Sequence, residues 1–356
     1  MNKDKQNLNK EPKTGTSFLN DKALFSIKTA NQWVDEAKTD PTPKKLFDEL
    51  WSEGEICVLF ATTGAGKSLL AVQIAQNIAA GQSIQFLKNE APPQKVLFFD
   101  FELSKKQFEI RYSQPDHTGE SQTNHYKFSD NFLRVELNNN SEIPLTKKYD
   151  TYVLESIEQC IQATGANIII IDNITWIRST LEKTQDAANL MQGLKKLKSK
   201  YGLSLLILTH TPKRNNAYHI TINDLAGSMM TGNFIDSCFA IGESTNDKSL
   251  RYIKQIKVRN FGFKYDADNV ILCEIAKETN FTGFHVKGYT VEAEHLKQFT
   301  NKDAESLEYN IAELRKEGNS FRQISNILGI SLAKVQRTIN KIEKSEEAEN
   351  NDEAPF

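Results

Sequence analysis

The chain has 356 residues, of which 39% are hydrophobic, and a formal net charge of -2 at pH 7. This length suggests about two domains, and the hydrophobic share is enough to bury a full core. The near-neutral charge excludes a protein that binds nucleic acid through bulk charge, so any basic surface must be local.

The start of the chain lacks the apolar segment of a secretion signal, and no apolar run is long enough to span a bilayer. The four cysteines show no paired metal-binding spacing, and Cys57 and Cys273 lie in apolar runs typical of small buried residues. Free cysteines fit a reducing compartment. We therefore expect a cytoplasmic protein with no membrane partner.

Residues 1–22 are polar and rich in Lys and Asn, which predicts disorder. From Glu53 onwards, apolar runs typical of strands alternate with helical periods. The predicted strands are Ile56–Phe60, Val96–Phe101, Asn167–Ile171 and Leu203–Thr209, and the predicted helices are Ser68–Ala80, Leu154–Thr164 and Asp186–Tyr201. Strands separated by helices imply an α/β fold, a parallel sheet with helices on both faces.

Two stretches break this alternation. Residues 112–150 are polar, with one strand-like run at Phe128–Val135, and resemble a surface insertion. Residues 250–290 are rich in strand patterns that would continue the sheet in antiparallel fashion, making it a mixed sheet: Arg251–Val258, Asn269–Ile275 and Gly283–Val291. The α/β domain is thus expected to cover residues 23–300.

A phosphate-binding loop is the strongest chemical signal. It follows the first strand, opens the first helix, and consists of Ala61, Thr62, Thr63, Gly64, Ala65, Gly66, Lys67 and Ser68. Its backbone N–H groups and the helix N-terminus would bind phosphate oxygens. Lys67 would reach the β- and γ-phosphates, and Ser68 would hold Mg²⁺. Ala61 replaces the usual first glycine, which is acceptable if the backbone there does not need a positive φ.

Two acidic residues leave strands at their carboxyl ends, where ligands bind in open α/β sheets. Asp172 follows four isoleucines and would hold Mg²⁺, although a plain loop cap is the alternative. Glu102 is a candidate base for the water that attacks the γ-phosphate. Asp100 is its rival on the same strand face, and a helix-capping role for Glu102 is the other interpretation.

Together these residues resemble the RecA-type ATPases, and among them the RepA-like and DnaB-like hexameric replicative helicases, AAA-type ATPases of mobile elements. The resemblance covers about Trp33 to Val291. Its features are the phosphate loop, Phe99-Asp100-Phe101-Glu102-Leu103-Ser104 with Gln107 and Arg111, Ile170-Ile171-Asp172-Asn173, Leu208-Thr209-His210, and Lys257-Val258-Arg259-Asn260.

The resemblance implies ATP and Mg²⁺ as cofactors and a homo-oligomeric ring, a hexamer. It implies that Glu102 is the catalytic base and that His210 senses the γ-phosphate. It also implies that Arg259 acts on the neighbouring subunit's nucleotide as an arginine finger, with Lys257 beside it. The alternative for His210 is a core histidine tied to the backbone, and without the resemblance Arg259 is better interpreted as a solvated strand residue of the basic run 254–259.

In this family the loops after the fourth strand face single-stranded DNA in the ring centre. Lys213 and Arg214 would contact DNA phosphates there, with ordinary surface charge as the alternative. The following segment leads to the pair Ile235-Asp236, as in the family.

The C-terminal part reads as a small all-α helix-turn-helix domain at residues 303–343, with helices at Leu307–Leu314, Ser320–Leu328 and Leu332–Ile342. The exposed face of the third helix would read duplex DNA with Lys334, Gln336, Arg337, Asn340 and Lys341. A protein-docking module is the alternative.

Residues 344–356 form an acidic tail expected to be disordered. Its end, Pro355-Phe356, resembles the tail tip of bacterial single-stranded-DNA-binding proteins and suggests a contact with a replication protein, with a solvating tail as the alternative. The whole chain is predicted to be an ATP-hydrolysing ring helicase of a plasmid, phage or other mobile element. The alternatives are an ATP-switched DNA-binding regulator or helicase loader, and a RecA-type signalling protein.

Overall fold

The computed structural model describes residues 25–114, 124–138, 148–174, 184–211, 214–225, 233–259, 262–298, 301–328 and 330–352. The chain divides into two compact units after Pro43. The first holds helix α1 (Ala30–Ala37), which Thr29 caps together with Gln32, and none of its side chains is buried. The predicted disordered residues 1–22 lie outside the described part.

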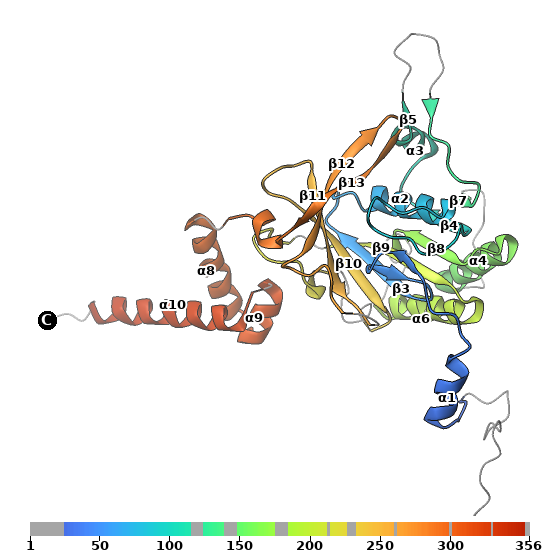
Figure 1. The fold of residues 1–356 in the computed structure, drawn as a ribbon. Helices are drawn as coiled ribbons and strands as arrows, with labels where there is room; N and C mark the ends of the chain where they lie inside the picture. Colours follow the sequence, from blue (N-terminus) through green and yellow to red (C-terminus); the bar gives the residue numbers. More distant parts are fainter. Residues whose placement is uncertain are drawn as a thin grey trace, which may run out of the picture. The chain divides into compact units, whose positions relative to one another are not determined.

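The second unit is built on a nine-stranded sheet in the order β13-β12-β11-β10-β3-β9-β8-β4-β7 (Figure 1). Its strands are β3 (Ile56–Ala61), β4 (Val96–Asp100), β7 (Phe132–Val135), β8 (Ile168–Asp172), β9 (Ser204–His210), β10 (Ser237–Glu243), β11 (Leu250–Lys257), β12 (Val270–Glu278) and β13 (Phe281–Thr290). Strands from β10 to β7 in this order pair in parallel, and β10 to β13 pair antiparallel. The predicted α/β fold with a mixed sheet is confirmed.

Side-chain alternation along β3 explains why helices cover both faces. Cys57 and Leu59 join the cluster beneath α2 (Lys67–Ala80), while Val58 and Phe60 join the opposite cluster. The opposite cluster includes apolar side chains of α4 (Tyr149–Thr164) and α6 (Thr184–Tyr201). A central strand buried on both faces reads as a continuous apolar run, which is why it was recognisable from the sequence.

Two parts of the sheet differ from the prediction. Strand β10 is not among the strands predicted from the sequence, and it contains two small residues, Ser237 and Gly242. In the structure the Ser237 hydroxyl donates to Glu55 (2.8 Å), and a Cβ on Gly242 would lie 2.0 Å from the Tyr252 ring. Strand β7 is an edge strand of the main sheet, parallel to β4, and not part of a surface insertion.

Smaller elements complete this unit. Four short strands form two-stranded pairs, and two 3-10 turns lie beside the sheet. They are β1 (Lys45–Phe47) with β2 (Trp51–Ser52), β5 (Ser113–Gln114) with β6 (Asn124–His125), and the turns η1 (Ile222–Asp224) and η2 (Glu292–His295). Cys57 and Cys273 are buried free thiols, as expected.

The C-terminal helices have an apolar cluster of their own. They are α8 (Asn301–Lys316), α9 (Phe321–Leu328) and α10 (Leu332–Asp352), and Ile311, Ile324 and Val335 are buried between them. The Ser320 hydroxyl accepts from the Gln323 amide and so caps α9. Helix α10 continues to Asp352, so residues 344–352 are helical where a disordered tail was expected. Among the described residues, no helix is long and apolar enough to cross a membrane.

Candidate nucleotide-binding site

The phosphate loop lies between β3 and α2. Gly66 caps α2 with φ 102°, and an added Cβ would lie 2.8 Å from Ile275 and 2.9 Å from Phe284. Gly64 has φ 84° but nothing near its Cβ position. Both positions favour glycine, and Gly66 also needs it for close packing against β12 and β13. Ala61 is the last residue of β3 and has no positive φ, so alanine is compatible with this loop.

Lys67 occupies the centre of the site and is only 5% exposed. Its ammonium donates to the carbonyl oxygens of Ala61 (3.1 Å) and Thr62 (3.2 Å) and to Nδ1 of His210 (3.1 Å). Burial lowers the pKa of Lys67, and the neighbouring carboxylates, chiefly Asp172, oppose that shift. The phosphate oxygens of a bound triphosphate would replace these carbonyl oxygens as acceptors for the Lys67 ammonium.

Ser68 and Asp172 are brought together by a side-chain hydrogen bond. Asp172 is 1% exposed, and its Oδ2 has no hydrogen-bond partner among the described residues. Burial raises the pKa of Asp172 to about 7, while the bond from Ser68 opposes the shift. A buried carboxylate oxygen without a partner beside a hydroxyl fits the oxygen ligands that Mg²⁺ prefers. Bound there, Mg²⁺ would neutralise charge on the β- and γ-phosphates.

Asp100 and Glu102 make different contacts. Asp100 is buried, and its carboxylate accepts from the Glu102 (3.1 Å) and Leu103 (2.9 Å) amides and from Arg134 (2.9 Å). It therefore holds the loop in shape. Glu102 points to the site, 3.3 Å from Nε2 of His210. The cap of α3 (Lys105–Arg111) is Ser104, so Glu102 is not the helix cap.

His210 ends β9 and connects Lys67 to Glu102. Because an ammonium can only donate, Nδ1 of His210 must accept from Lys67. Its Nε2 faces Oε1 of Glu102 at 3.3 Å and Nδ2 of Asn173 at 2.8 Å. These side-chain contacts differ from those of a core histidine tied to the backbone, and they place His210 where a change at Lys67 reaches Glu102.

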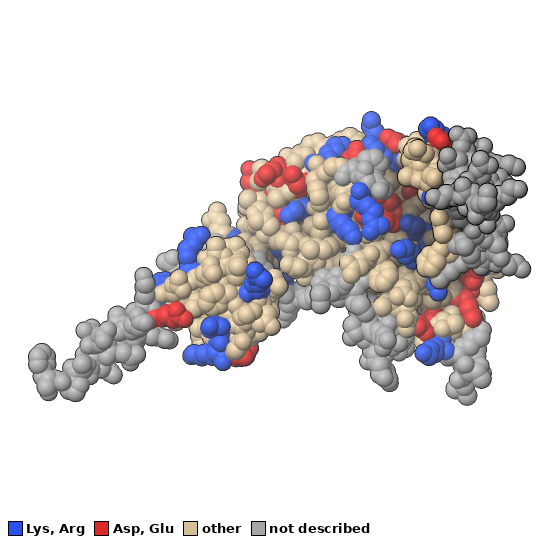
Figure 2. Space-filling view, turned by 90° about the horizontal axis from the view of Figure 1, so that it is seen from below, with Lys and Arg blue, Asp and Glu red and all other residues tan. Residues whose placement is uncertain are grey.

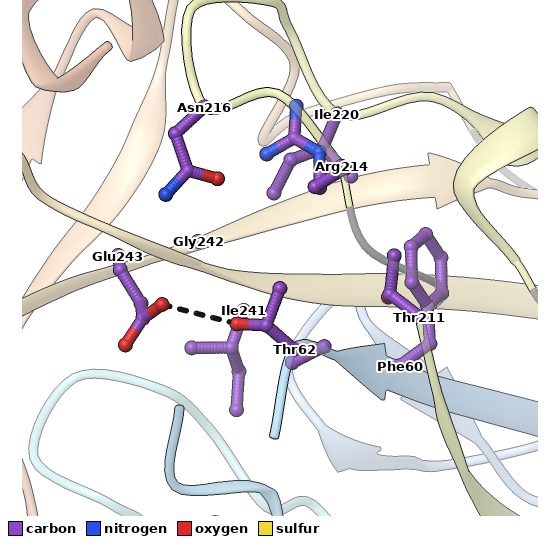
Figure 3. A pocket seen from close by; sticks show the side chains of 10 residues that line it. Phe60, Thr62, Thr211, Arg214, Asn216, Ile220, Ile241, Gly242 and Glu243 are labelled. Atoms are coloured by element: carbon purple, nitrogen blue, oxygen red, sulfur yellow. Dashed lines mark hydrogen bonds between the residues drawn. The ribbon is translucent and has the colours of Figure 1, made fainter. Parts of the chain in front are cut away.

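Two site residues escaped the sequence reasoning. Glu243 ends β10 and accepts a hydrogen bond from the Thr62 hydroxyl at 3.1 Å (Figure 3). Arg251 pairs with Glu243 on β11 and donates from Nε to the Ala65 carbonyl (3.1 Å). They hold the phosphate loop from the β10–β11 side. Their position beside the phosphate loop follows from the register of β10 with β11, and β10 is not among the strands predicted from the sequence.

A small pocket adjoins this side of the loop (Figure 3). It lies between the ends of β3 and β10 and the segment that follows β9. Its lining residues are Phe60, Ala61, Thr62, Thr211, Arg214, Asn216, Ile220, Ile241, Gly242 and Glu243.

Lys257 and Arg259 lie at the opposite edge of the sheet. Lys257 pairs with Cys238, and Cys238 with Val58 near the start of β3, whereas the phosphate loop follows the end of β3. Arg259 is half-exposed and pairs with Asp236 at 2.6 Å. The structure therefore does not bring Lys257 or Arg259 to the chain's own phosphate loop.

The predicted DNA contacts after β9 receive no support. Lys213 lies outside the described residues. The Arg214 side chain is 9% exposed, lies 3.4 Å from Asp224 and donates to the Tyr218 carbonyl. An arginine engaged in this way is not presented to a DNA backbone, so we correct its role to holding the segment 214–225.

The predicted contacts on the C-terminal helices are at the surface. Four exposed side chains of α10 are Lys334, Gln336, Arg337 and Lys341. Lys341 is paired with Glu308 of α8 at 2.7 Å. Figure 2 shows Lys and Arg in separate small groups between acidic ones, several of them on the C-terminal helices at left.

The fold and site together define a P-loop ATPase. A family model described as an AAA domain matches residues 25–216, and the chain belongs to this family. The match contains the phosphate loop, Glu102, Asp172 and His210, and ends before Arg251.

Among solved structures, the chain is similar to a KaiC-like protein from the hyperthermophilic archaeon Pyrococcus horikoshii. The two are 15% identical, the alignment covers 66% of this chain and 91% of that one, and the TM-score is 0.45. A comparison with curated proteins gave no match.

Proposed function

We propose that this protein is a DNA-associated ring ATPase of the replicative-helicase type, acting in replication or mobilisation of a plasmid, phage or other mobile element. In this proposal Lys67 binds the β- and γ-phosphates, Glu102 activates the attacking water, and His210 responds to the γ-phosphate. Arg259 of one subunit, beside Lys257, neutralises transition-state charge at the next subunit's nucleotide.

The observation that carries the proposal is the separation of Arg259 from its own phosphate loop. Glu102, Asp172 and Lys67 lie at one edge of the sheet, and the half-exposed Arg259 lies at the other. Head-to-tail repetition of such a subunit joins the two edges, and closing the repeat makes a ring. The exposed Gln336 and Arg337 on α10 support DNA association, because amide and guanidinium groups suit base edges and phosphates.

A mixing experiment tests the shared site. Lys67→Ala chains keep Arg259, and Arg259→Ala chains keep the phosphate loop. Each is expected to be inactive alone, whereas mixed oligomers regain hydrolysis at the sites that pair an intact loop with an intact arginine. If oligomers that demonstrably contain both variants regain no ATP hydrolysis, Arg259 does not act on the neighbouring subunit's nucleotide.

A second measurement tests the helicase type. We expect an oligomer in solution, a hexamer by mass, whose ATP hydrolysis rises when single-stranded DNA is added. A monomer whose hydrolysis ignores DNA would instead support an ATP-switched DNA-binding regulator or helicase loader, the second candidate that the C-terminal helices favour. Arg337→Ala should weaken duplex DNA binding but leave basal hydrolysis unchanged; unchanged DNA binding would favour a protein-docking module.

The end of the chain carries a further part of the proposal. Pro355 and Phe356 lie outside the described residues, and we propose that they contact a replication protein through an apolar pocket with a basic rim. Deleting both should weaken binding to such partners, and unchanged binding would refute this contact.

A further inference from the structure

Asn173 lies directly after the metal-site carboxylate, at the end of β8, and is only 3% exposed. Its Nδ2 donates to Oε1 of Glu102 and lies 2.8 Å from Nε2 of His210. Nε2 of His210 lies 3.3 Å from the same Oε1. Side chains at the ends of two neighbouring strands, β8 and β9, therefore meet at one oxygen of the Glu102 carboxylate.

Glu102 needs such support because its side chain is flexible and 37% exposed. A general base must stay within hydrogen-bond reach of the water proton, and small displacements lower rates strongly. Both contacts fall on Oε1, while Oε2 makes no hydrogen bond with the described residues. This arrangement fixes the carboxylate and leaves Oε2 for the water.

The chemistry of an amide suits this place. A cation next to Asp172 would compete with Mg²⁺ for that carboxylate, and an anion would repel Glu102. The Asn173 amide donates an N–H while adding no charge, so it restrains the base without changing the electrostatic balance of the metal site.

We propose that Asn173 is a positioning residue for ATP hydrolysis, which holds Glu102 through Oε1 so that Oε2 meets the attacking water. The inference rests on the proposed role of Glu102 as the base. It adds a residue whose loss lowers turnover without weakening nucleotide binding.

The test compares Asn173→Ala with Asn167→Ala, an exposed asparagine just before the other end of the same strand. For Asn173→Ala we expect kcat to fall about 10- to 100-fold, while KM and the dissociation constant of a non-hydrolysed ATP analogue with Mg²⁺ change less than about twofold. Asn167→Ala should leave kcat and KM unchanged. Asn173→Asp keeps the shape but cannot donate, so it should lose at least as much as alanine.

A double substitution shows whether Asn173 acts through Glu102. In a Glu102→Gln background, Asn173→Ala should lower the remaining rate little further, because the group it positions is gone. Independent, multiplicative losses would overturn the proposal. Loss of nucleotide affinity in proportion to kcat would also overturn it, since it would make Asn173 a nucleotide contact.

The outcomes for the inference and for the proposed function are distinct. Full turnover in Asn173→Ala, with hydrolysis abolished in Lys67→Ala, would refute only the role of Asn173. No hydrolysis by the wild-type chain would refute both. Should Asn173→Ala fold poorly, judged by its thermal midpoint, Asn173→Ser decides: a short hydroxyl keeps a donor there and is expected to retain more turnover than Asn173→Asp.

Discussion

The two edges of the parallel sheet are built in opposite ways. At the carboxyl edge, where the parallel strands end, Lys67 contacts His210 and His210 contacts Glu102. Asp172 is almost wholly buried at the same edge. At the amino edge, Arg259 is half-exposed and held by one ion pair to Asp236, which Lys198 shares at 2.9 Å. The first edge is organised by contacts within one chain, whereas the second leaves the Arg259 guanidinium half-exposed.

The largest expected effect lies at the carboxyl edge. Lys67→Ala removes the ammonium at the centre of the site and should lower ATP hydrolysis about 10³-fold or more. Steady-state turnover measures it, with the exposed Lys248→Ala as the matched control. Retained hydrolysis in Lys67→Ala would show that this edge is not the reaction site and would remove the contrast.

The amino edge, where Arg259 lies, should affect ATP hydrolysis only when chains associate. Arg259→Ala is expected to lower hydrolysis about 10²- to 10³-fold, somewhat less than a full arginine finger can provide, and to leave nucleotide binding intact. Wild-type turnover per chain should rise with protein concentration until the oligomer is complete. Turnover that is independent of concentration and insensitive to Arg259→Ala would reduce the amino edge to ordinary surface.

A smaller effect sharpens the account of the phosphate loop. Gly66 and Gly64 both have positive φ, but only Gly66 is crowded by Ile275 and Phe284. Overpacking usually costs about 1–3 kcal/mol, so Gly66→Ala should weaken nucleotide binding about 5- to 140-fold more than Gly64→Ala. Titration with a fluorescent ATP analogue compares the two variants. Equal losses would mean that backbone strain alone governs the loop.

The smallest effect concerns pH. The raised pKa of Asp172, about 7, means that the folded site holds a proton that Mg²⁺ must displace. The apparent Mg²⁺ affinity of the site should therefore rise about tenfold between pH 6 and pH 8. In the absence of metal, the same shift makes this group's contribution to folding stability fall as pH rises from about 4 to about 7. Asp172→Asn is the control, because any pH dependence of Mg²⁺ affinity that remains in this variant comes from the phosphates of the nucleotide.

The carboxyl edge was predictable because its residues stand at the ends of apolar runs. Asp172 and His210 each close a strand that is buried on both faces, and parallel strands bring such ends together. The sequence alone does not show which of Asp100 and Glu102 faces the site. The distinction depends on Arg134, which binds Asp100 and lies on β7, in the segment predicted to be a surface insertion.

The β10–β11 side was not predictable for a related reason. Ser237 and Gly242 are packing residues whose small size imitates a loop, and without β10 there is no register that places Arg251 at the phosphate loop. Arg214 shows the reverse error: its charge suggested an exposed contact, and only the fold reveals its burial between Asp224 and Tyr218.

The pair of strands β10 and β11 runs from one edge of the sheet to the other. Glu243 and Arg251 bind the phosphate loop at the carboxyl edge, and Lys257 and Arg259 lie at the amino edge. The seven residues of β10 span about 23 Å. In the ring proposed above, this strand pair would connect the nucleotide site of one subunit with the surface that faces the next subunit.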